Sequence, residues 1–116
     1  MKTNILSSIL FLVGTFLITY CTSASGGTDT ATFKVYGNCE MCKERIEGSL
    51  KGVKGVQSAI WDVASKNIKV VYDAKVISAD EIQKKVAGVG HDTEKISANA
   101  GAYKSLPGCC QYSRKK

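Results

Sequence analysis

A chain of 116 residues, of which 44 % are hydrophobic and 22 % are charged, is long enough for one small globular domain and too short for two. Its formal net charge of +6 is moderate, and the lysines and arginines are dispersed along the chain. Because these basic residues are not interleaved with aromatic ones, we expect a solvated surface and no nucleic-acid binding. The positive charge is also compatible with docking onto an acidic protein partner.

The amino-terminal segment has the features of a secretory signal. Lys2 is followed by an apolar run over residues 5–20, and small residues up to Ala24 then supply a cleavage site. The run is short for a membrane span. We therefore expect residues 1–24 to be a signal peptide and the protein to be exported to the periplasm. Cys21 leaves an alternative open, a lipoprotein anchored at that cysteine, and only then would the chain associate with a membrane.

A short polar segment separates this signal from the domain. Residues 25–31 are small and polar, which predicts a flexible lead-in to a domain spanning residues 32–97. Apolar and polar side chains alternate in residues 32–36, "TFKVY", with the period of a half-buried strand. The stretch "NCEMC" follows and opens a helix, in which apolar residues from Cys42 to Val53 recur at helical spacing.

The rest of the domain predicts a hairpin, a second helix and a last strand. Two alternating segments joined by the turn "ASKN" indicate the hairpin. Ser78 and Glu81 form a capping-box pattern at the start of the second helix, and "HDTEKIS" after it alternates weakly, as an edge strand. This order predicts an α+β fold, a ferredoxin-like βαββαβ sandwich with a four-stranded antiparallel sheet and two helices on one face.

Cys39 and Cys42 form a CxxC motif where a loop meets the first helix. This spacing brings two sulfurs to one point, and the free N–H groups and positive dipole end of the helix lower the pKa of thiols there. Two thiolates suit a soft, low-coordinate cation such as Cu(I) or Hg(II), and they fall short of the four ligands of a structural zinc site. Thiol–disulfide exchange and a plain structural disulfide use the same motif and remain open at this point.

The motif and its surroundings resemble the heavy-metal-associated domain, a family that includes copper chaperones, amino-terminal modules of copper-transporting ATPases and the periplasmic mercury-binding protein. The similarity runs from Phe33 to Lys95 and comprises "CEMC", "GVKGVQSAIWDV", "IKVVYD" and "VGHDTEK", in that order. One departure concerns the loop. The family usually has Gly-Met two and three residues ahead of its first cysteine, whereas here Asn38 precedes Cys39 and the methionine, Met41, lies between the cysteines.

The resemblance implies a metal-binding protein, not an enzyme, that carries or sequesters one ion on Cys39 and Cys42. Cu(I) is the first expectation, with Hg(II) or Zn(II) as the others. The partner would be a metal-transporting ATPase or another acidic metal-accepting protein that takes the ion by ligand exchange. In similar domains the residue after the second helix's glycine approaches the metal, which makes His91 a candidate ligand. The alternative function is thiol–disulfide exchange, although Asn38 stands where thioredoxin-like proteins have a tryptophan.

The carboxyl-terminal tail, residues 98–116, lies outside the domain pattern and contains Cys109 and Cys110. Adjacent cysteines are poorly arranged to chelate one ion, but Pro107 and Gly108 allow the tail to fold back and bring one thiolate to the CxxC pair. A third or fourth ligand of this kind would shift the preference toward Zn(II) or a tighter Cu(I) site. A disulfide, either between tail and domain or between the two neighbours, is the structural alternative.

Overall fold

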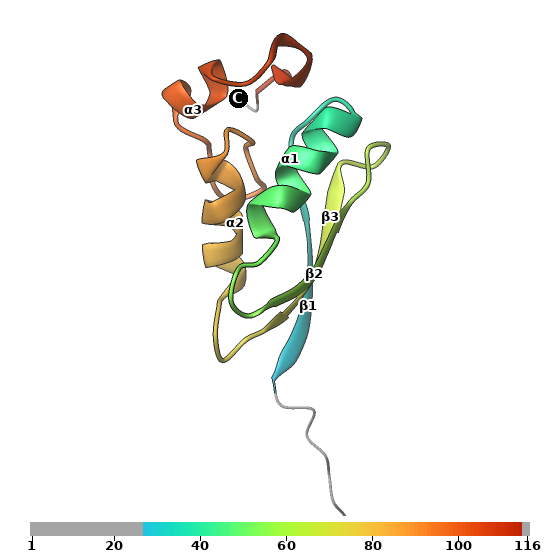
Figure 1. Ribbon diagram of the computed structural model, residues 1–116, viewed down its shortest axis with the longest axis vertical. Coiled ribbons are helices and arrows are strands. Elements are labelled where there is room, and N and C mark those ends of the chain that lie inside the picture. The colour runs from blue at the N-terminus through green and yellow to red at the C-terminus, as the bar shows by residue number, and fades with distance from the viewer. Residues whose placement is uncertain (1–26, 115–116) are drawn as a thin grey trace, which may run out of the picture.

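The structure, a computed structural model, describes residues 27–114, so the predicted signal peptide and Cys21 lie outside the described residues. The elements, in chain order, are β1 (Thr28–Lys34), α1 (Glu40–Leu50), β2 (Val56–Trp61), β3 (Asn67–Asp73), α2 (Ala79–Gly88), the short helix α3 (Ala100–Lys104) and the 3-10 turn η1 (Gly108–Cys110) (Figure 1). The first five follow the predicted order. None of the helices described is long and apolar enough to cross a bilayer.

The strands form an antiparallel sheet in the order β1-β3-β2, with β3 in the middle. Side chains of β3 alternate between buried and more exposed, and the buried ones are Ile68, Val70 and Tyr72. In Figure 1, α1 and α2 lie side by side against one face of this sheet. The structure thus has the α+β class and the antiparallel sheet that the sequence predicts, with the core between the sheet and the two helices.

The expected fourth strand, in "HDTEKIS", is reduced to a single antiparallel bridge between Val35 and Thr93. After this bridge the chain turns, because the Thr93 N–H donates to the Ile96 carbonyl at 2.7 Å. The buried Gln83 side chain stabilises the turn by accepting hydrogen bonds from the Thr93 hydroxyl at 2.7 Å and the Lys95 N–H at 3.0 Å. These hydrogen bonds compete with a strand ladder. The sheet of residues 27–114 therefore has three strands, and the prediction of four is not met there.

Strand β1 begins at Thr28, although composition predicts a flexible lead-in up to residue 31 and a domain that starts at residue 32. Thr28 pairs with Asp73, and Ala31 pairs with Val70, in one continuous register with β3. The residues before Phe33 are small or polar, so they carry no alternation of apolar side chains from which a strand is recognised. Backbone pairing with β3, and not side-chain pattern, extends the strand.

Each of the two long helices buries one face, as their apolar spacing predicts. Three residues of α1 are buried: Cys42, Ile46 and Leu50. At the start of α2, the Glu81 N–H donates to Ser78 Oγ at 3.1 Å and the Ser78 N–H donates to Glu81 Oε2 at 3.4 Å. This reciprocal pair is the capping box that the sequence predicts, and it fixes where α2 begins.

The tail folds back across the end of the domain at which α1 begins (Figure 1). Leu106, Cys110 and Tyr112 are buried and belong to the same core cluster as the helices and sheet. Gly90, just after α2, has a φ of 104°, and a Cβ built there would lie 2.8 Å from the Ala102 carbonyl oxygen. Only glycine combines this backbone conformation with so close an approach of α3.

Candidate metal centre

The CxxC pair lies at the amino-terminal end of α1. Cys39 is the N-cap residue, with extended backbone, and Cys42 follows in the first turn of the helix. Their Sγ atoms are 3.8 Å apart, and the Asn38 N–H points at Cys42 Sγ from 3.3 Å. Cys42 is fully buried, whereas Cys39 is half-buried. The structure therefore brings the two predicted ligands together and leaves the pair accessible from the side of Cys39.

The loop before Cys39 is supported by Trp61 and not by the methionine. A Cβ at Gly37 would lie 3.0 Å from Trp61 Cη2 and 3.1 Å from Cys42 Cβ, so the loop packs closely on both. The Trp61 indole N–H donates to the Val35 carbonyl at 3.1 Å, which holds the buried ring in place. Met41 is 48 % exposed. The ring of Trp61, at the end of β2, therefore packs under this loop.

The thiols of the site differ in acidity. Hydrogen bonds from the backbone N–H groups of Cys42 and Met41 lower the pKa of the Cys39 thiol. Burial raises the pKa of the Cys110 thiol to about 12. Cys39 is consequently the thiol that ionises more readily of these two, and it is also the more accessible one.

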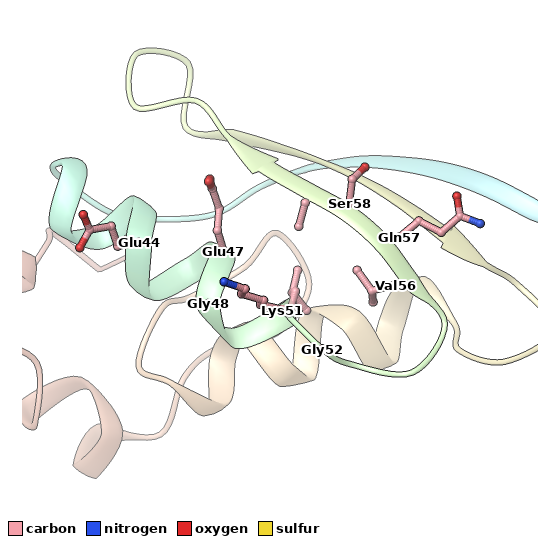
Figure 2. Close-up of a pocket in the computed structure, with 10 residues that line it drawn as sticks. Glu44, Glu47, Gly48, Lys51, Gly52, Val56, Gln57 and Ser58 are labelled. Carbon is pink, nitrogen blue, oxygen red and sulfur yellow. The ribbon is translucent and has the colours of Figure 1, made fainter.

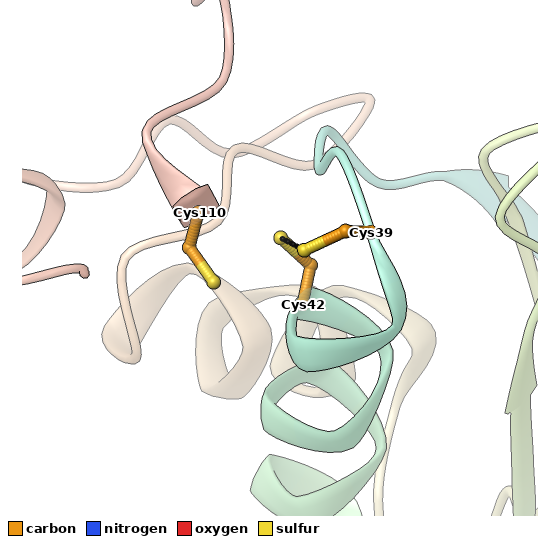
Figure 3. A group of neighbouring side chains, drawn as sticks. All are labelled: Cys39, Cys42 and Cys110. Atoms are coloured by element: carbon orange, nitrogen blue, oxygen red, sulfur yellow. Dashed lines mark hydrogen bonds between the residues drawn. The ribbon is translucent and has the colours of Figure 1, made fainter. Parts of the chain in front are cut away.

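Cys110 joins the pair from the tail. The Sγ atoms of Cys39, Cys42 and Cys110 all lie within 4.8 Å of one another. Figure 3 shows the Cys110 side chain directed from η1 toward the pair on α1. The four described cysteines, these three and Cys109, are free thiols, so the alternative of a tail–domain or vicinal disulfide is not seen.

Cys109 lies outside this group of sulfurs. It is exposed, and its Sγ lies 3.4 Å from Met41 Sδ and 4.0 Å from Cys110 Sγ. Its backbone carbonyl is directed toward the site instead, 3.7 Å from Cys39 Sγ. The turn η1 therefore separates the neighbours, placing the Cys110 sulfur inside and the Cys109 sulfur at the surface.

His91 is fully buried and is not among the grouped sulfur ligands. Its Nδ1 lies 2.8 Å from the Tyr36 carbonyl, to which an Nδ1–H can donate, and its ring stacks on Tyr112 with centroids 5.4 Å apart. Burial lowers the pKa of His91, which favours the neutral ring. The structure thus places this predicted ligand as a packing residue between the domain and the tail.

Two tail residues that no sequence pattern marks, Tyr112 and Arg114, hold Cys110 in place. The Tyr112 hydroxyl donates to the Gly90 carbonyl at 2.7 Å and accepts from the Asp92 N–H at 2.6 Å. The Arg114 guanidinium forms a two-pronged pair with the buried Asp92 carboxylate, at 2.8 and 3.1 Å. These contacts join residues far apart in the sequence, and no local motif marks them.

A separate hollow lies between the outer side of α1 and strand β2 (Figure 2). It has a volume of about 420 Å³, and its lining includes Glu44, Glu47 and Lys51. No cysteine lines it, and Figure 2 shows its side chains arrayed along the helix and strand. The sulfur group at the start of α1 is therefore the site whose chemistry calls for an explanation.

The sequence matches the model of one protein family, described as the heavy-metal-associated domain, over residues 28–92. A zinc-transporting ATPase of Synechocystis sp. is 43 % identical over 54 residues, which are 47 % of this chain and 8 % of the ATPase. The copper chaperone CopZ of Staphylococcus haemolyticus is 26 % identical over 57 residues, which are 49 % of this chain and 84 % of the chaperone. The ATPase match thus concerns one small region of a much longer protein.

A solved structure has the same fold. It is the amino-terminal domain of a potential copper-translocating P-type ATPase from Bacillus subtilis, in the Cu(I)-loaded state. The two chains superpose with a TM-score of 0.55 and 27 % identity, and the match covers 63 % of this chain and 98 % of that one. The tail thus extends beyond the family match, which ends at residue 92.

Proposed function

The chain belongs to the heavy-metal-associated domain family, and on that premise we propose that it binds one soft metal ion between the thiolates of Cys39 and Cys42. The observation that carries this proposal is the pair of sulfurs 3.8 Å apart at the start of α1, one buried and one accessible. Thiolates select soft ions. Cu(I) is the first candidate, supported by the copper proteins among the relatives; Zn(II) and Hg(II) are the others.

Binding and release would follow from the unequal thiols. Cys39 ionises more readily than an ordinary cysteine because backbone N–H groups stabilise its thiolate, so it is the natural first contact for the ion. For transfer, a partner thiolate forms a bond to the bound ion, the bond to Cys39 then breaks, and the ion is never released to water. The protein thus carries or sequesters the ion without catalysing a reaction.

We propose as partner an acidic metal-accepting protein, such as a metal-transporting ATPase. Arg45 is exposed on α1 and can attract it. Lys43 is less free, since its Nζ donates to the Trp61 carbonyl at 2.7 Å and lies 3.2 Å from Glu47 Oε2. Export to the periplasm, or anchoring as a lipoprotein at Cys21, remains part of this proposal and rests on sequence alone.

The test is a Cu(I) competition titration of the reduced protein against a chromogenic chelator. Replacing both residues (Cys39→Ser with Cys42→Ser) should abolish tight binding, while Cys109→Ser, an exposed cysteine outside the sulfur group, should not. Native mass spectrometry should count one ion per chain. An affinity unchanged in the double variant would refute the proposal. Absence of binding by the wild type, together with catalysed reduction of a protein disulfide, would favour thiol–disulfide exchange.

A further inference from the structure

We propose that Cys110 is the third ligand of the ion held by Cys39 and Cys42, so that the tail completes a three-thiolate site. This inference rests on the proposed function of the pair. It starts from the group of three sulfurs, from α1 and from η1, that all lie within 4.8 Å of one another. Figure 3 shows these side chains converging from two separate segments.

The separation within the pair favours a third ligand. A metal–thiolate bond of about 2.3 Å places two sulfurs about 4.6 Å apart across a linear ion and about 4.0 Å apart around a trigonal one. The observed separation between Cys39 Sγ and Cys42 Sγ is 3.8 Å. This separation is closer to the trigonal value than to the linear one, so a bent arrangement with a further donor requires less movement of the two sulfurs.

Cys110 is held where that donor is needed. Its N–H donates to the Pro107 carbonyl at 2.8 Å, which closes the turn η1, and its side chain is fully buried. Leu106 and Tyr112 anchor the chain in the core on either side of it. Because these contacts are independent of any ion, little conformational entropy remains to be lost when Cys110 binds.

The competing explanation is that Cys110 is merely a small apolar residue of the core. Packing alone would require its volume and not its sulfur. The chain places that sulfur beside two others, however, while the neighbouring Cys109 sulfur lies at the surface. The two explanations differ in one measurable respect, the number of sulfurs bonded to the ion.

A third ligand changes what the protein does with its cargo. The Cys110 thiol releases its proton to water as its bond to the ion forms, and the thiolate then occupies the position that an incoming partner thiolate would take. The partner must displace Cys110 before it can receive the ion. The tail thus favours retention over rapid transfer, and a three-thiolate site also suits Zn(II) better than a pair does.

The experiment uses the reduced protein loaded with one equivalent of Cu(I) and, separately, of Hg(II). X-ray absorption spectroscopy counts the sulfurs around each ion in the wild type, which needs no variant. Cys110→Ser and Cys110→Ala are then compared with Cys109→Ser as the matched control, with circular dichroism to verify folding. Affinity is measured by chelator competition, and release by transfer of the ion to a small dithiol.

We expect three sulfurs in the wild type and in Cys109→Ser, and two in the Cys110 variants. Loss of Cys110 should weaken binding by at least the roughly 10- to 100-fold that even an outer-shell partner contributes, and should speed transfer to the dithiol. Two sulfurs in the wild type, with tight binding, would overturn this inference and leave the proposed function standing. A loss of the third sulfur in Cys109→Ser in place of the Cys110 variants would also overturn it. No binding in the wild type would overturn both.

Discussion

Replacing Gly90 by alanine should detach the tail from the domain and expose Cys110. Gly90 has a φ of 104°, and an added Cβ would lie 2.8 Å from the Ala102 carbonyl oxygen and 3.0 Å from two carbons of Leu106. An L-residue in this conformation is strained by about 1–3 kcal/mol. The overlap adds about 1–3 kcal/mol where nothing moves. Movement of α3 and Leu106 away from α2 relieves the overlap, so we expect the tail to move.

Gly90→Ala should therefore lower the free energy of unfolding by about 2–6 kcal/mol if the tail stays docked. If the tail leaves, the loss falls toward the backbone strain alone, about 1–3 kcal/mol. A small domain is stable by about 5–15 kcal/mol, so the variant should still fold. Two other glycines serve as controls. Gly88→Ala meets no atom within 4 Å and should be neutral or slightly stabilising. Gly55→Ala is strained at a φ of 94° and overlaps Val76, away from the tail.

Two measurements check this prediction. Urea denaturation gives the free energy of unfolding, and pulsed alkylation with peptide mass spectrometry gives the accessibility of each cysteine. We expect Gly90→Ala to label Cys110 at a rate that approaches that of the exposed Cys109, whereas Gly55→Ala should lose stability without exposing Cys110. A Gly90→Ala protein with wild-type stability and a protected Cys110 would refute the packing argument.

Three further predictions concern acidity and capping. Burial lowers the pKa of His91 from its ordinary value of 6.5, so the unfolded chain binds more protons than the folded one. The free energy of unfolding should therefore fall as the pH drops below 6.5. In urea titrations, His91→Gln should flatten this pH dependence. Near neutral pH, iodoacetamide should modify Cys39 before Cys110. Backbone N–H groups lower the pKa of the Cys39 thiol, whereas burial raises the pKa of the Cys110 thiol to about 12. Modification of Cys110 first would contradict this reasoning. Ser78→Ala should lower the free energy of unfolding by about 1 kcal/mol through loss of the α2 capping box, against little change for the exposed Ser113→Ala.

Where the prediction of the fold succeeded, the signal was local. Alternation marked β2 and β3, helical spacing marked the buried face of α1, and Ser78 with Glu81 marked the start of α2. Where it failed, a non-local contact decided. Small residues from Thr28 to Ala31 join β1 by pairing with β3, and the side chain of Gln83 turns the chain away after Thr93, where a fourth strand was expected.

The sequence by itself determined that the thiols of Cys39 and Cys42 lie at the start of a helix. CxxC spacing and helical periodicity are properties of neighbouring residues, so both can be recognised without the fold. Only the tertiary structure decided which other predicted ligands meet them. It buries His91 under Tyr112, leaves Cys109 at the surface and brings Cys110 to the pair. The physical reason is that docking of the tail depends on contacts with residues far away in the chain, and periodicity carries no information about such contacts.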